Sequence, residues 1–112
     1  MDVVVESWQD KIRHLAPALE SAEFDVFKCD ADIKQLQAKL EISSVAMGYK
    51  TIAAQKQYAE AHDKLYDARL RLGCAKGALS ALKVTLKSLE IGFEEWRTKM
   101  VNSREERKRY GA

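Results

Sequence analysis

The chain has 112 residues, of which 46% are hydrophobic and 32% charged, with one proline, five glycines and a net charge of +2. This length allows at most one domain, and the composition excludes both a disordered chain and a β-sandwich. The charge is unevenly distributed, because residues 1–50 carry nine acidic and six basic side chains, whereas residues 51–112 carry eight and thirteen. We therefore expect an acidic first half to face a basic second half.

A heptad pattern predicts a first helix over about residues 3–43, since alternating three- and four-residue spacing is typical of coiled coils. Pro17 lies within this helix and predicts either a kink or a break, with a short helix over about residues 3–15 followed by a longer one that begins at Pro17. The two rows of the seam are Val5, Ile12, Leu19, Val26, Ile33 and Leu40, and Trp8, Leu15, Ala22, Cys29, Leu36 and Ser43.

The heptad phase breaks after Leu40, which predicts a turn at about residues 44–50 and a second helix over about residues 51–108. Ser44 or Thr51 is expected to cap that helix. The alternative is one continuous helix with a length of roughly 160 Å. A coiled coil tolerates such a phase shift, and Gly48 inside a helix costs only about 1 kcal/mol relative to alanine. The rows of the second seam are Tyr58, Leu65, Leu72, Leu79, Leu86, Phe93 and Met100, and Ala61, Ala68, Ala75, Leu82, Leu89 and Trp96.

The two seams fit together antiparallel, with Ile33 facing Ala61, Trp8 facing Leu86 and Val5 near Leu89. Most layers then combine a large residue with a small one, which fills space without overpacking. The predicted fold is all-α, a long antiparallel helical hairpin (coiled coil) that forms a single domain over residues 1–112. The same register predicts the flanking charge pairs Asp32–Lys64, Asp25–Arg71, Asp30–His62 and Glu23–Arg69.

A two-helix hairpin has too little interior to bury this much apolar surface. Two outer surfaces are left over, one with exposed aromatic residues and one with small residues at close spacing. We expect these surfaces to form a homodimer interface and so a four-helix bundle. The simpler alternative is that they are scattered apolar residues on the surface that form no interface. The interface residues are Phe24, Phe27, Leu70, Gly73, Gly77 and Ala81.

The C-terminal end of the second helix is predicted to run past the first helix. It is either a self-capping end or a binding site for another protein, because aromatic residues beside arginine are typical of interfaces. A nucleic-acid contact by the basic residues is a further alternative. The candidate partner-binding residues are Phe93, Trp96, Arg97, Met100, Arg104, Arg107, Lys108 and Arg109.

Catalytic motifs are not found in the sequence. Cys29 is expected to be a buried inert thiol and Cys74 an outer-face thiol, which fits a reducing compartment. His14 and His62 lie on different helices, and no metal-binding or phosphate-binding motif occurs. We therefore expect no enzyme activity, no cofactor and no metal. The uncharged stretches are too short to span a bilayer and the N-terminus is unlike a signal peptide, so a cytoplasmic protein without a membrane partner is expected.

Residues 43–98 resemble small helical-hairpin proteins of tailed bacteriophages. The similarity rests on the turn SSVAMGYK, the basic alanine-rich second helix and its leucine row from Leu65 to Leu89. The resemblance implies a phage accessory protein in the host cytoplasm and transfers no catalytic residue. The predicted function is thus a non-enzymatic protein-interaction module that binds a recombination protein or inhibits a host defence or repair complex. The alternatives are a nucleic-acid-binding accessory protein and a structural spacer.

Overall fold

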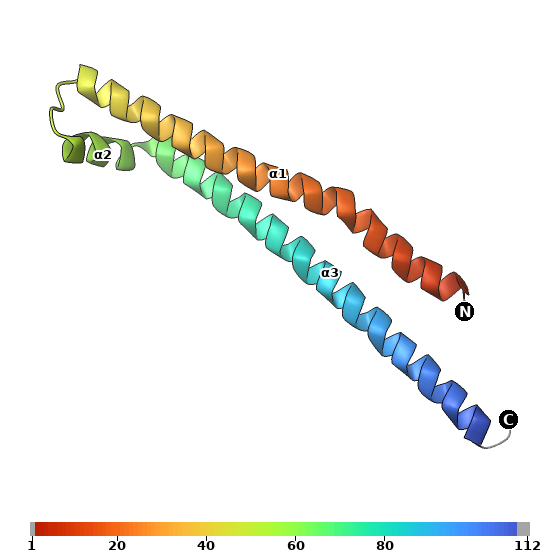
Figure 1. Cartoon of the computed structure of the whole chain (residues 1–112). Coiled ribbons are helices and arrows are strands. Elements are labelled where there is room, and N and C mark those ends of the chain that lie inside the picture. Colours follow the sequence, from red (N-terminus) through yellow and green to blue (C-terminus); the bar gives the residue numbers. More distant parts are fainter. Residues whose placement is uncertain (1, 110–112) are drawn as a thin grey trace. The chain divides into compact units, whose positions relative to one another are not determined.

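The computed structural model describes residues 2–109, with side chains from Ser7 onward, and consists of helices (Figure 1). Helix α1 spans Asp2–Ala46, α2 spans Ile52–Glu60 and α3 spans Asp63–Arg109. No strand occurs in this described part of the chain. The predicted all-α class is therefore confirmed.

The chain divides into two compact units, each built from part of α1 and part of α3, and the second also contains α2. Unit 1 comprises the chain up to Leu19 and from Ala81 on, and unit 2 comprises Glu20–Ser80. Within each unit the two helical segments run antiparallel (Figure 1), as the heptad seams predict. Buried and half-buried side chains follow the predicted rows. In unit 2 they include Ala22, Val26, Cys29, Ile33, Leu36 and Leu40 on α1, and Leu65, Ala68, Leu72, Ala75 and Leu79 on α3.

Helix α1 ends in a Schellman motif built on Gly48, the one glycine of the described residues with a positive φ, at 98°. The Tyr49 N–H donates to the carbonyl of Ser44 and the Gly48 N–H to that of Val45, each at 3.1 Å. This pair of bonds satisfies the last carbonyls of a helix and turns the chain out of it. The continuous-helix alternative is therefore wrong.

Thr51 caps α2, since its hydroxyl accepts a hydrogen bond from the Ala54 N–H at 3.1 Å. Of the two expected caps, Thr51 is thus correct. Ser44 instead lies in the last turn of α1, where it is fully buried and its hydroxyl donates to the Glu41 carbonyl at 2.6 Å.

The second predicted helix is broken into α2 and α3 at Ala61 and His62. His62 caps α3, because its Nδ1 accepts a hydrogen bond from the Lys64 N–H at 3.1 Å. A bidentate pair between Arg69 of α3 and Glu60 of α2, at 2.5 and 2.7 Å, spans the break. A break changes the phase of the seam, so Ala59 is buried in place of Ala61, which is exposed. The predicted Ile33–Ala61 layer is therefore wrong.

Pro17 does not break α1, which continues through it from Asp2 to Ala46. Its side chain is exposed. The proline ring removes one backbone donor and so frees a carbonyl one turn earlier. On an exposed face that carbonyl can bind water, which explains how the helix continues. The two-helix alternative for residues 3–43 is not observed.

The predicted register is wrong in unit 1 by about one heptad. Trp8 contacts Gly92 and Phe93 rather than Leu86, with a distance of 6.4 Å between the Trp8 and Phe93 ring centroids. Two heptad seams remain in phase after a slide of seven residues, so periodicity does not determine which layer faces which. The large Trp8 indole fits opposite Gly92, where no side chain takes up the space.

The predicted charge pairs between the helices are replaced by local ones. Arg69 pairs with Glu60 instead of Glu23, and Asp30 pairs with Lys34 at 3.3 Å instead of His62. Lys34 is four residues from Asp30 on the same helix, a spacing that brings side chains together without help from a second helix. Neither Asp25–Arg71 nor Asp32–Lys64 forms an ion pair in the described part of the chain.

Candidate interaction surfaces

An aromatic cluster joins α1 and α3 in unit 1. Phe93 lies edge-on to Trp8 and stacks on Trp96, with ring centroids 6.1 Å apart in the second pair. The Lys11 ammonium lies 5.6 Å from the Trp8 ring, within cation–π range. Phe93 therefore does not run past the first helix, contrary to expectation, but is half-buried against Trp8 of α1.

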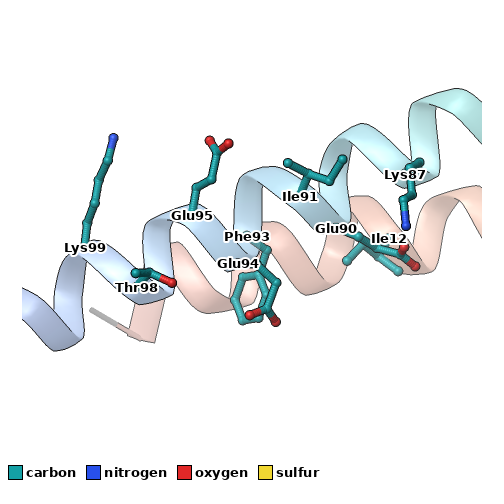
Figure 2. A pocket seen from close by; sticks show the side chains of 9 residues that line it. All are labelled: Ile12, Lys87, Glu90, Ile91, Phe93, Glu94, Glu95, Thr98 and Lys99. Atoms are coloured by element: carbon teal, nitrogen blue, oxygen red, sulfur yellow. The ribbon is translucent and has the colours of Figure 1, made fainter.

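An open groove of about 730 Å³ runs beside this cluster (Figure 2). Figure 2 shows Glu95 and Lys99 pointing to one side of α3, and Phe93 and Glu94 to the other. The lining side chains do not converge, so the groove offers contact surface rather than an enclosed ligand cavity. Its residues are Ile12 of α1 and Lys87, Glu90, Ile91, Phe93, Glu94, Glu95, Thr98 and Lys99 of α3.

The remaining candidate partner-binding residues continue along the last turns of α3. Trp96 and Met100 are half-buried. Arg97 forms an exposed ion pair with Glu94 at 3.8 Å. The basic side chains at the end of the helix are exposed, and they suit the negative pole of the helix dipole. These exposed residues are Arg104, Arg107, Lys108 and Arg109.

The outer face of unit 2 carries the predicted dimer residues, and the side chains are exposed. Phe24 is 62% exposed, Phe27 is 70% and Leu70 is 52%. A Cβ atom added at Gly73 or Gly77 would meet nothing within 4 Å. Phe24 and Phe27 lie on α1, and Leu70, Gly73 and Gly77 lie on α3. Together we call these five exposed positions the outer face of unit 2. The sixth predicted residue, Ala81, is also exposed but belongs to unit 1.

A further apolar surface was missed by sequence reasoning and lies at the turn between α1 and α2. We call it the apolar turn. The signal was present in the sequence, since residues 42–59 contain two lysines and no acidic residue. Heptad analysis discards this stretch because its phase is broken there. Its exposed side chains are Ile42, Val45, Met47, Tyr49 and Ile52.

The residues considered for chemistry are dispersed. Cys29 is half-buried and Cys74 exposed, and both are free thiols. His14 is exposed, and His62 serves as the cap of α3. Among the described side chains, no group of three or more His, Cys, Asp or Glu residues is placed to hold a metal ion. None of the described helices is long and apolar enough to cross a membrane.

No protein family, curated protein or solved structure matches this chain. We therefore infer the function from the exposed surfaces of the chain.

Proposed function

We propose that the protein is a non-enzymatic helical interaction module that pairs through the outer face of unit 2 with a second copy of itself. The observation that carries this proposal is the exposure of Phe24 and Phe27, one helical turn apart, at 62% and 70%. Exposed aromatic residues that cluster on one face mark interaction sites in soluble proteins. Gly73 and Gly77 lie on the same unit and would allow a partner helix to approach closely.

The charge of unit 2 favours a second copy as the partner of this face. Residues 20–80 carry nine acidic and nine basic side chains, so two copies do not repel each other overall. The α1 segment of this unit has six acidic and three basic residues, and the α3 segment has two acidic and four basic. A two-fold arrangement that sets α1 of one copy against α3 of the other brings opposite charges together.

The test is the mass in solution of a Phe24→Ser, Phe27→Ser double variant. We expect the unaltered protein to have twice the chain mass of 12.7 kDa and the variant to dissociate at micromolar concentration. Val101→Ser is a matched control, since Val101 is 49% exposed but lies in unit 1. Equal masses for all three proteins would contradict the proposal.

The resemblance to phage hairpin proteins supports a cytoplasmic role in which this module binds a recombination protein or inhibits a host complex. In that role the end of α3 is the second binding surface, with half-buried Trp96 and Met100 beside exposed Arg97. The Trp96→Ser variant should no longer bind a purified candidate partner. The Phe24→Ser, Phe27→Ser variant should still bind it if the end of α3 and the outer face act independently.

A nucleic-acid contact is the second candidate, because Arg107, Lys108 and Arg109 are exposed in the last turn of α3. Phosphate contacts of this kind weaken steeply with salt. Charge reversal of all three residues should abolish binding of labelled single-stranded DNA at low salt. DNA binding that is unchanged by the reversal, or absent in the unaltered protein, would exclude this candidate.

A further inference from the structure

We infer that the apolar turn contacts the surface of anionic membranes, with its apolar side chains inserted at the level of the lipid headgroups. The turn presents Ile42 and Ile52, each 71% exposed, with Met47 at 65% and Val45 at 56%. Such side chains gain from leaving water, and their clustering in a segment of eleven residues is unlike scattered surface residues. Contact of this kind lies at the membrane surface and needs no spanning helix.

The charge around the turn specifies the kind of lipid. Lys50 and Lys56 are the charged residues of the 42–59 stretch, and both are exposed. Of the acidic residues that flank the stretch, Glu41 is half-buried and Glu60 is paired with Arg69. Lysines that flank inserted apolar residues keep their ammonium groups in the headgroup layer and are attracted to anionic lipids. Tyr49 suits the same layer, because an aromatic ring with a hydroxyl favours the boundary between acyl chains and water.

The backbone of the turn is prepared for an environment with little water. Unpaired backbone groups are costly to bury in lipid. The Met47, Gly48 and Tyr49 N–H groups donate to carbonyls of the last turn of α1 at 3.1 to 3.2 Å. The Tyr49 carbonyl accepts a hydrogen bond from the Gln55 side-chain amide at 3.1 Å. The backbone from Met47 to Tyr49, between the exposed residues Val45 and Ile52, can therefore lose water at reduced cost.

A second copy of the chain is a less suitable occupant. Two apolar turns brought together would bring the two lysines of each 42–59 stretch into one contact, with no acidic residue from either stretch, and like charges oppose that contact. This inference is independent of the proposed self-association, which uses the outer face.

The test is sedimentation of the full chain with vesicles of phosphatidylcholine alone or with phosphatidylserine added. We expect binding to the anionic vesicles and at least tenfold weaker binding to the neutral ones. Ile42→Ser, Ile52→Ser should lose binding, and Lys50→Glu, Lys56→Glu should weaken it by at least about tenfold. Val84→Ser is the matched control, since Val84 is 66% exposed on α3 and should bind normally.

The mass of each variant in solution separates the possible outcomes. If Ile42→Ser, Ile52→Ser binds anionic vesicles like the unaltered protein, or if the unaltered protein does not bind them, the inference is wrong. If that variant instead loses self-association without vesicles, the turn contacts a second copy and not a membrane. Circular dichroism confirms that each variant remains helical.

Discussion

The indole of Trp8 occupies the space that a side chain on Gly92 would need. A Cβ atom at Gly92 would lie 2.7 Å from Cη2 and 3.2 Å from Cζ3 of Trp8, whereas carbon atoms in favourable contact are about 3.5–4.0 Å apart. Gly92 thus makes room for the aromatic cluster that joins α1 and α3 in unit 1, and the pair sets the register of that unit.

Gly92→Ala should therefore destabilise the protein. Alanine favours the helix by about 1 kcal/mol over glycine, but overpacking typically costs about 1–3 kcal/mol. We expect a net loss of roughly 1 kcal/mol in the free energy of unfolding, measured by denaturant titration followed by circular dichroism. A double variant, Trp8→Ala with Gly92→Ala, removes the clash and should show that the alanine is then favourable relative to Trp8→Ala alone. A stabilised Gly92→Ala single variant would contradict this account of the register.

Gly77→Ala should have a different effect, because a Cβ atom there meets nothing within 4 Å in the chain itself. In an isolated chain the change should stabilise α3 by up to about 1 kcal/mol. If the outer face packs closely against a second copy, the same methyl group weakens association. We expect a higher dissociation constant for the dimer, measured by dilution with light-scattering detection. Stabilisation with an unchanged dissociation constant would exclude Gly77 from the interface.

His62→Ala should loosen the start of α3, because the Lys64 N–H loses its acceptor at 3.1 Å. Loss of a helix N-cap costs about 0.5–2 kcal/mol. His62→Asn is the matched control, since asparagine is a favourable N-cap and should largely retain stability. The free energy of unfolding and amide exchange at Lys64 measure the effect. Equal stability of the alanine and asparagine variants would show that the cap contributes nothing.

The pair between Glu60 and Arg69 predicts a pH dependence of the junction between α2 and α3. The hydrogen bonds from Arg69 lower the pKa of the Glu60 carboxyl, and its positive charge acts in the same direction. A lowered pKa in the folded state means that the pair stabilises the junction above the ordinary carboxyl pKa. This contribution is lost as the pH falls through the lowered value.

The measurement is the titration of the Glu60 carboxyl by NMR. Its midpoint should rise in Arg69→Gln and stay in place in Arg71→Gln, which removes a neighbouring arginine but not the pair. Both side chains are exposed, so added salt should reduce the difference. A midpoint that is equal in all three proteins would show that the pair does not form in solution.

The sequence predicts which face of each helix is buried, because burial follows the heptad rows from Trp8 to Leu40 and from Leu65 to Met100. It does not predict the register, since a repeating pattern fits again after one heptad. The Trp8–Gly92 contact is specific, but it depends on a single glycine that lies beside the heptad rows and not in them. The predicted charge pairs suggested another register and were misleading, because exposed lysine and arginine side chains reach nearer partners at little cost.

The break between α2 and α3 also escapes prediction. Ala61 is a good helix former, and neither proline nor glycine marks the end of α2. The break depends on His62 as a cap and on the pair of Glu60 with Arg69, nine residues apart, neither of which has a short sequence signature. Of the candidate sites, the outer face is exposed as expected, whereas Phe93 is half-buried against Trp8.

We propose that a second copy covers the outer face of unit 2. The most direct measurement is the absolute mass of the unaltered chain by light scattering on a sizing column. We expect a mass of twice 12.7 kDa at micromolar concentration. A mass of 12.7 kDa at the highest attainable concentration would contradict it.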